Sequence, residues 1–117
     1  MKIIPLGHSH LQISSLCLGA INFGTKLDEK ASFAILDRYV EAGGNCIDTA
    51  NNYSYWYNGK GGESETVLGN WMKDRGNRED VIIASKVGFN TPEIGHGLSE
   101  SLIKSEFEGS LSRLRTE

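Results

Sequence analysis

The chain has 117 residues, of which 38% are hydrophobic and 23% are charged, values typical of a soluble globular protein with one domain. Its formal net charge is −3 and no basic cluster stands out, which argues against a nucleic acid or an anionic membrane surface as a partner. The sequence contains no long apolar run, and residues 1–5 lack the pattern of a signal peptide. We therefore expect a cytoplasmic protein that binds neither nucleic acid nor membrane.

The two cysteines, Cys17 and Cys46, lie in separate apolar segments without the spacing of metal ligands or the density of a disulfide scaffold. We expect both to be buried, reduced thiols. The histidines have no Cys, Glu or His at ligand spacing, so no metal site is predicted. They are His8, His10 and His96.

The first half of the chain predicts a hairpin, a helix and a strand. Residues 2–18 mix apolar positions with a Gly-His-Ser-His turn, which indicates a short hairpin at one end of the fold. A helix is predicted after Asp28, an N-cap residue, because apolar side chains then recur at helical spacing until Gly43 and Gly44. Residues 45–47 form a short buried strand that ends at Asp48.

The second half repeats this order. Residues 63–75 predict a helix with acidic side chains in its first turn and basic ones in its last. Residues 81–85 are mostly β-branched and apolar, as in a strand covered on both faces. After a looser segment at 88–97, Ser99 begins a third helix. We expect its inward face to consist of Leu102, Ile103, Phe107, Leu111 and Leu114.

Strands that alternate with helices indicate an α/β fold with right-handed crossovers and a parallel sheet. The carboxyl ends of parallel strands share one edge, where function usually gathers. Asp48 and Lys86 end the two predicted strands, and Tyr53 follows the first. We expect these three side chains to meet at that edge.

A carboxylate, an amine and a phenol together make a proton donor. An isolated tyrosine ionises only near pH ~10, but a neighbouring cation such as Lys86 favours the phenolate, and Asp48 would keep Lys86 charged. Such a donor suits hydride addition to a carbonyl, where the developing alkoxide must be protonated. Each residue also has a simpler interpretation: the Asp as a turn former, the Tyr as packing, and the Lys as a solvated strand end.

Other patterns have less weight. The glycines at 19–24 and 59–62 match neither a phosphate loop nor the dinucleotide fingerprint. Glu63 and Glu65 are interpreted as serving the helix terminus, not catalysis. The aromatic side chains at 55–57 either wall an apolar substrate pocket or pack on the rim of the fold.

Several stretches together resemble the N-terminal part of an aldo-keto reductase, in that family's order and over almost the whole chain. They are Leu6-Gly7-His8-Ser9, residues 13–19, Asn22-Phe23-Gly24, residues 48–53, Gly62-Glu63-Ser64-Glu65, Leu68-Gly69 and Ser85-Lys86. The resemblance implies catalytic Asp48, Tyr53 and Lys86, with Tyr53 as the general acid. It implies cofactor contacts by Gly19, Ala20 and Asp48. Two positions depart from the family: His10 replaces a common glycine, and Ala20 replaces a frequent threonine and lacks its hydroxyl.

The resemblance also implies a fold, a TIM (β/α)8 barrel of roughly 250 residues. Residues 1–117 would be an incomplete domain: a β-hairpin followed by about three β/α units, truncated before the fourth barrel strand. The implied activity is reduction of a small aldehyde or ketone, with NADPH as the cofactor and NADH as the alternative. No oligomeric state is predicted.

An alternative from a different class is a truncated, non-catalytic reductase fragment, or one part of an assembly. A fourth catalytic residue, a histidine at the end of the next strand, is implied by the family and is absent from residues 1–117. An exposed sheet edge and uncovered helix faces would then favour association. On this basis we expect negligible activity from the isolated chain.

Overall fold

The structure is a computed structural model that describes residues 1–89 and 97–117. The chain first forms an antiparallel hairpin of two strands, β1 (Ile3–Pro5) and β2 (Gln12–Ser14). A parallel sheet follows, with the strand order β3 (Leu18–Gly19), β4 (Cys46–Asp48) and β5 (Ile82–Ala84). The helices are α1 (Glu29–Glu41), α2 (Tyr55–Asn58), α3 (Glu63–Arg75), the 3-10 turn η1 (Arg78–Asp80) and α4 (Glu100–Leu114).

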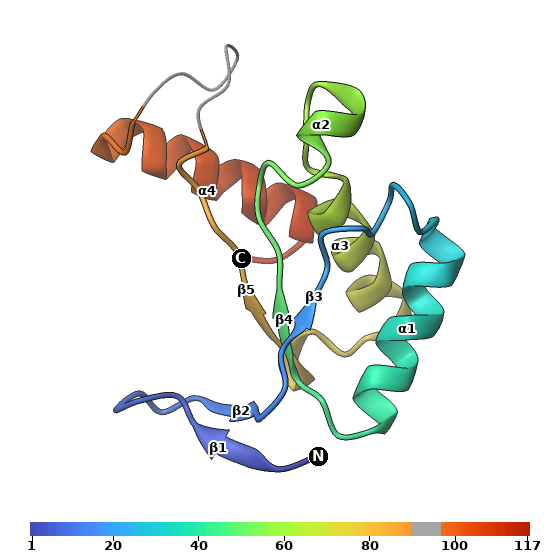
Figure 1. The fold of residues 1–117 in the computed structure, drawn as a ribbon. Helices are drawn as coiled ribbons and strands as arrows, with labels where there is room; N and C mark the ends of the chain where they lie inside the picture. The colour runs from blue at the N-terminus through green and yellow to red at the C-terminus, as the bar shows by residue number, and fades with distance from the viewer. Residues whose placement is uncertain (90–96) are drawn as a thin grey trace.

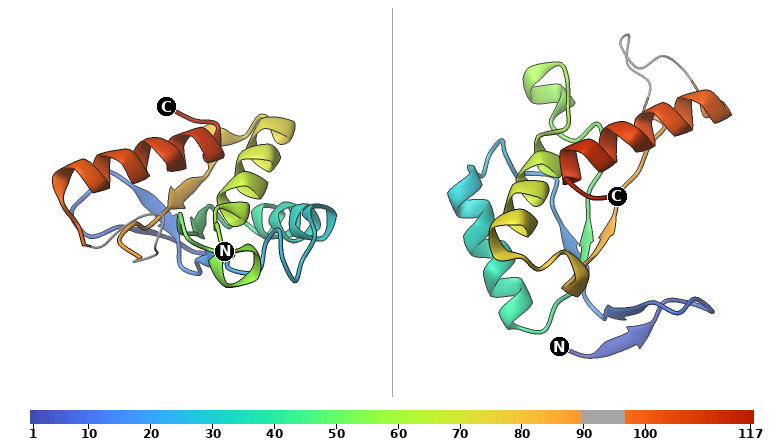
Figure 2. Two further views of the ribbon diagram at one scale, coloured as in Figure 1. Left: turned by 90° about the horizontal axis from the view of Figure 1, so that it is seen from above. Right: turned by 180° about the vertical axis from the view of Figure 1, so that it is seen from behind.

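The helices α1, α3 and α4 lie on one face of the parallel sheet, while no described helix covers the other face (Figures 1 and 2). The β1–β2 hairpin lies at the amino ends of the strands, and α2 lies beyond their carboxyl ends (Figure 1). The described residues thus form a helix-covered portion of a parallel sheet and not a closed barrel.

The three long helices, α1, α3 and α4, begin where the sequence predicts. The Asp28 side chain accepts a hydrogen bond of 2.8 Å from the Ala31 amide at the start of α1, and Ser99 caps α4 through the Leu102 amide. Helix α3 begins at Glu63 and ends before Gly76, whose φ of 63° suits a left-handed C-cap.

The core lies between the helices and the sheet. Its most buried large side chains are Phe23, Leu36, Ile47, Leu68 and Trp71. Because neighbouring side chains of a strand point to opposite faces, Ile47 enters this core while Asp48 points to the uncovered face.

Tyr39 joins the hairpin, α1 and β4. Its hydroxyl oxygen lies 2.7 Å from Ser14 Oγ, 2.7 Å from the Leu16 carbonyl oxygen and 2.8 Å from the Cys46 carbonyl oxygen. The ring packs on the Gly44 backbone, where a Cβ would stand 2.3 Å from it. Gly44 therefore makes room for this anchor just beyond the end of α1.

Several sequence-based expectations are wrong in detail. The hairpin ends at Ser14, and Leu18–Gly19 already belongs to the parallel sheet. Residues 81–85 are not covered on both faces, since Ala84 is exposed on the face that lacks helices. In α4, Ile103 is 40% exposed, and Phe107 faces the sheet as expected but is 56% exposed because it lines an open pocket there.

The two cysteines differ. Cys46 is buried as expected, but Cys17 is exposed, because its neighbour Leu18 packs on the core and Cys17 therefore points to the uncovered face. The Cys17 thiol itself is partly enclosed beside Cys46. Partial burial and the hydrogen bond with Cys46 raise the pKa of Cys17 to about 11.

His8 and His10 are exposed, while His96 and most of the looser segment 88–97 lie outside the described residues. Within residues 1–89 and 97–117, no three His, Cys, Asp or Glu side chains cluster as metal ligands. In the same part of the chain, no helix has the length and apolarity needed to cross a membrane.

Candidate active site

Lys86 and Asp48 form an ion pair at the carboxyl edge of the sheet. Asp48 is the last residue of β4, and Lys86 follows β5 by two positions. The Lys86 Nζ donates hydrogen bonds of 2.8 Å to both carboxylate oxygens of Asp48 and one of 2.5 Å to the Thr49 carbonyl oxygen. Parallel pairing of β4 with β5 places these residues side by side.

Tyr53 completes the group from the loop after β4. Its hydroxyl donates to Asp48 Oδ2 at 3.3 Å, and Lys86 Nζ lies 4.7 Å from the centre of its ring. The three side chains that the sequence singles out are thus brought together. What each of them does chemically stays a prediction.

The electrostatics of the group favour a charged lysine. Partial burial disfavours the ammonium form, but hydrogen bonds to Asp48 and Tyr53 outweigh that effect and raise the pKa of Lys86 above its ordinary value. The side chains of Lys86 and Asp48 are 48% and 38% exposed, so a ligand can reach them. The group therefore presents a cation at neutral pH next to a phenol hydroxyl.

Gly19 and Ala20 lie beside Asp48 but differ in access. Gly19 pairs with Asp48 in the sheet, and no atom lies within 4 Å of the place where its Cβ would stand. The Ala20 amide donates to the Asp48 carbonyl oxygen at 2.9 Å, and the residue is fully buried. Gly19 thus leaves open space for a flat ring next to Asp48, whereas the Ala20 methyl group packs into the core.

Two residues in the first turn of α3 were not recognised as part of the site from the sequence. Ser64 Oγ donates to the Ala20 carbonyl oxygen at 2.8 Å and lies 2.8 Å from Thr49 Oγ1. The Glu65 carboxylate is fully buried and accepts from Ser85 Oγ at 2.6 Å. A signal was present: Glu65 stands one turn before Leu68, on the apolar side of the helix, where an acidic residue is out of place.

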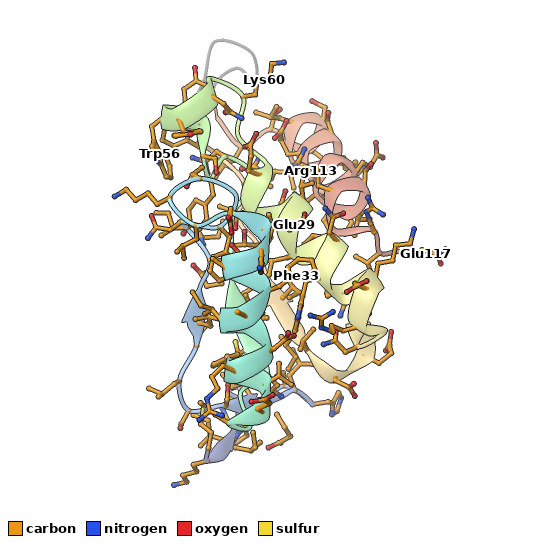
Figure 3. The ribbon with its side chains drawn as sticks, turned by 90° about the vertical axis from the view of Figure 1, so that its right-hand side faces the viewer. Glu29, Phe33, Trp56, Lys60, Arg113 and Glu117 are labelled. Atoms are coloured by element: carbon orange, nitrogen blue, oxygen red, sulfur yellow. The ribbon has the colours of Figure 1, made fainter. Side chains whose placement is uncertain are left out.

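The aromatic side chains after Tyr53 form the short helix α2. The rings of Tyr53 and Trp56 meet edge to face with centroids 6.2 Å apart, and those of Tyr55 and Phe89 are 6.0 Å apart. Trp56 and Tyr57 are 58% and 70% exposed, and Figure 3 shows Trp56 at the end of the molecule formed by α2. Both interpretations of these side chains, as pocket wall or as rim packing, stay open.

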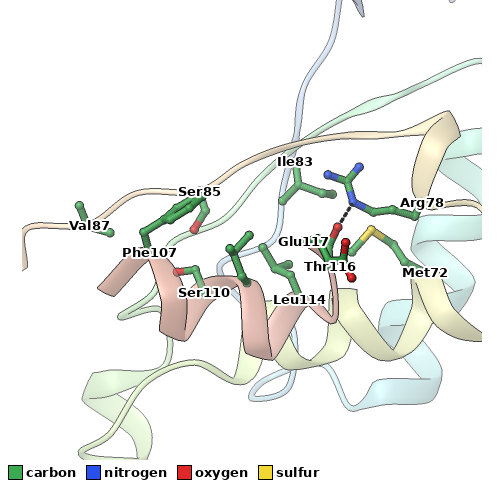
Figure 4. Close-up of a pocket in the computed structure, with 11 residues that line it drawn as sticks. Met72, Arg78, Ile83, Ser85, Val87, Phe107, Ser110, Leu114, Thr116 and Glu117 are labelled. Atoms are coloured by element: carbon green, nitrogen blue, oxygen red, sulfur yellow. Dashed lines mark hydrogen bonds between the residues drawn. The ribbon is translucent and has the colours of Figure 1, made fainter. Parts of the chain in front are cut away.

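A separate pocket of about 360 Å³ lies on the helix-covered face of the sheet, between β5 and α4 (Figure 4). Its lining includes Met72, Ile83, Ser85, Phe107 and Leu114. Asp48, Tyr53 and Lys86 do not line it. It is therefore distinct from the candidate active site.

Comparison with known proteins identifies the family. The model of the Aldo/keto reductase family matches residues 15–117. The chain is 40% identical over 124 residues to the uncharacterized oxidoreductase YrpG of Bacillus subtilis, covering 100% of this chain and 37% of that protein. It is 40% identical over 110 residues to the norsolorinic acid reductase stcV of Emericella nidulans, covering 88% of this chain and 26% of that one.

The fold agrees. The aldo-keto reductase AKR11C1 from Bacillus halodurans, solved in its holo form, superposes with a TM-score of 0.80 at 36% identity, covering 99% of this chain and 37% of that one. The described residues are an α/β portion of the TIM barrel of such enzymes. The chain thus spans little more than a third of the length of YrpG and AKR11C1. By sequence and by fold, the chain belongs to the aldo-keto reductase family.

Proposed function

We propose that the chain supplies the proton-donating half of an NAD(P)H-dependent aldo-keto reductase that reduces an aldehyde or ketone to an alcohol. The observation that carries the proposal is the convergence of Asp48, Tyr53 and Lys86 at one edge of the sheet. Family membership makes an oxidoreductase the expected class of enzyme. A cytoplasmic location and a small carbonyl substrate belong to the same proposal.

Tyr53 is the proposed proton donor. When bound, a reduced nicotinamide supplies the hydride that adds to the carbonyl carbon. The carbonyl oxygen, placed beside the Tyr53 hydroxyl, takes the phenol proton as its negative charge develops. The charge left on the phenol oxygen is then stabilised by the Lys86 ammonium.

Asp48 holds the cation in place. A lysine that is partly removed from water tends to lose its proton, and the two hydrogen bonds to Asp48 oppose that loss. Asp48 also accepts a hydrogen bond from the Tyr53 hydroxyl, which must turn from Asp48 to a bound carbonyl oxygen in order to donate its single proton there.

The surroundings of Gly19 fit a nicotinamide ring. The open space at this position adjoins Asp48, so a flat ring there would lie next to the three side chains. We propose NADPH as the cofactor, with NADH as the second choice, and Gly19, Ala20 and Asp48 as its contacts. For the buried Ala20 the contact would be made by the backbone, because its methyl group is in the core.

A second candidate is a non-catalytic reductase fragment or one part of an assembly. It is favoured by the sheet face on which Asp48 and Ala84 lie, since no described helix or strand covers it. Under this alternative the three side chains are present but the chain alone binds no cofactor productively.

One experiment separates the two candidates. NADPH-linked reduction of a simple aromatic aldehyde is measured by absorbance, first with the 117-residue chain and then with a chimera in which this chain replaces the equivalent segment of the Bacillus halodurans AKR11C1. We expect negligible turnover from the chain alone and measurable turnover from the chimera that disappears with Tyr53→Phe. A chimera that folds and binds NADPH but reduces nothing would leave only the non-catalytic alternative.

A further inference from the structure

The first turn of α3 contacts the ends of all the parallel strands. Ser64 bonds to the Ala20 carbonyl, directly after β3, and to the Thr49 hydroxyl, directly after β4. Glu65 accepts from Ser85, directly after β5. These two adjacent residues therefore fix the spacing between the strand ends that bear the candidate active site.

The Glu65 side chain is shielded from bulk solvent. It is fully buried, and its second oxygen accepts a hydrogen bond of 2.7 Å from Arg113 Nε on α4. A buried carboxylate is stable only when paired and hydrogen-bonded, and both of its oxygens are used here. Its place in the fold thus depends on Ser85 on one side and Arg113 on the other.

Two glycines make room for the Arg113 side chain and backbone. A Cβ at Gly62 would stand 2.7 Å from Arg113 Cδ, and one at Gly69 would stand 2.2 Å from the Arg113 carbonyl oxygen. Figure 3 shows Arg113 reaching from α4 towards α3. The close approach of α3 and α4 at these glycines is what lets the guanidinium reach Glu65.

The Glu65–Ser85 bond acts on Lys86 through the backbone. Side chains alternate along an extended segment, so a Ser85 held on the helix side directs Lys86 to the opposite face, where Asp48 lies. Figure 4 shows Ile83, Ser85 and Val87 on the side of this segment that faces α4.

The backbone of this segment is held on one edge. The Thr49 amide donates to the Ala84 carbonyl at 2.9 Å, and the Asn51 amide donates to the Lys86 carbonyl at 3.1 Å. In the part of the chain that the structure describes, the opposite edge of β5 has no strand partner. The Ser85 side chain is therefore the second restraint on the strand end.

We propose that Glu65 is a positioning residue that acts through Ser85 to hold Lys86 against Asp48 and Tyr53, with Arg113 as its counter-ion. This inference rests on the proposed function in one respect: the proposed function assigns Lys86 its role beside the proton donor Tyr53. The positioning itself is independent of any reduction step.

The test measures the protonation of Lys86 in the 117-residue chain. Competitive acetylation over a range of pH, read by mass spectrometry, gives the titration of this one amine. Ser85→Ala removes the hydrogen bond to Glu65 and no charge. We expect it to make Lys86 react about threefold to tenfold faster at mildly alkaline pH, because a lysine less well placed against Asp48 loses its proton more easily.

Two variants sharpen the result. Ser85→Thr keeps a hydroxyl at this position and is expected to restore the wild-type titration. Glu65→Gln keeps an oxygen acceptor for Ser85 and removes the charge that pairs with Arg113. We expect Glu65→Gln to change the reactivity of Lys86 less than Ser85→Ala does. We also expect it to lower the free energy of unfolding relative to the wild type.

Asp37→Ala is the matched control. Asp37 accepts from Trp71 and Arg75 in the later turns of α3, so its loss destabilises the same helix away from the first turn that contacts the strand ends. It should leave the Lys86 titration unchanged. An unchanged titration in Ser85→Ala, or an equal shift in Asp37→Ala, would overturn the proposal; if Glu65→Gln does not fold, the two Ser85 variants decide alone.

The outcome is distinguishable from that of the proposed function. Lys86 acetylation involves neither NADPH nor a carbonyl substrate. The Ser85 result can therefore support positioning by Glu65 even if the chimera shows no turnover, and the reverse also holds.

Discussion

Lys86 Nζ lies 2.8 Å from each of the two carboxylate oxygens of Asp48, so the lysine bonds to both oxygens of the carboxylate at once. The pair joins two strands whose residues are 38 positions apart in the chain. Tyr53 is the third member because its hydroxyl donates to one of the same oxygens. A substitution at Asp48 should consequently alter the positions and hydrogen bonds of both Lys86 and Tyr53.

Asp48→Asn should lower the pKa of Lys86, since partial burial would then act with less opposition. In the wild-type protein the raised pKa of Lys86 means that its protonated form stabilises the fold. This contribution is fully present below pH 10.5, the pKa of an ordinary lysine, and is lost as the pH rises through the higher pKa of Lys86. Urea unfolding from neutral to alkaline pH checks this: the stability difference between wild type and Asp48→Asn should vanish in strong alkali. A difference that grows with pH would contradict it.

Cys17 should react slowly with iodoacetamide despite its exposure. Its thiol pKa of about 11, against 9.0 for an unperturbed thiol, leaves about a hundredfold less thiolate at neutral pH. Mass spectrometry of the alkylated chain should show labelling that rises steeply towards pH 11. Cys46→Ala removes a cause of the shift and should speed the labelling; rapid labelling of the wild type at neutral pH would show that the thiol is not perturbed.

Gly69→Ala should destabilise the fold. The new Cβ would stand 2.2 Å from the Arg113 carbonyl oxygen, a backbone atom that cannot turn aside, and overpacking of this kind costs about 1–3 kcal/mol. Gly109→Ala is the matched control within a helix, because its Cβ would meet only the movable end of the Arg113 side chain at 3.2 Å. That change should be neutral or stabilising, by up to about 1 kcal/mol, from helix propensity. Urea unfolding measures the stability of both variants. An equal loss of unfolding free energy in Gly69→Ala and Gly109→Ala would refute the close contact at Gly69.

Asp37→Asn should lower the free energy of unfolding at neutral pH. Hydrogen bonds from Arg75 and Trp71 lower the pKa of Asp37, so its contribution to stability is present above the unfolded value of 3.8 and is lost as the pH falls through its folded value. The difference in the free energy of unfolding between wild type and Asp37→Asn should therefore become smaller at acidic pH. Glu41→Gln is the control, because Arg38 and Glu41 form a pair 84% and 65% exposed that should contribute nothing measurable.

The helices were largely predictable because their ends are set locally. Residues 63–75 are bounded by acidic side chains at the start and by Gly76 at the end, and α3 has these bounds. The short helix α2 was missed, since its four residues carry no apolar periodicity and it follows Ser54 at a φ of 85°. A left-handed serine is fixed by the surrounding structure and leaves no mark in the sequence.

The site was predictable in part. Asp48, Tyr53 and Lys86 follow predicted strands, and the parallel order of those strands brings them together. The contacts of Glu65 with Ser85 and Arg113 join residues 20 and 48 positions apart, and only the packed fold reveals them. The exposure of Cys17 was likewise not predictable, because it depends on which face of the sheet the helices cover.

The most direct test of the proton-donating group is the kcat/KM of the chimera with and without the Tyr53 hydroxyl. General acid catalysis contributes about 10²–10⁴ in rate, so Tyr53→Phe should lower kcat/KM at least about a hundredfold while NADPH binding is retained. A variant that keeps its turnover within a few-fold of the unmodified chimera would show that the phenol donates no proton.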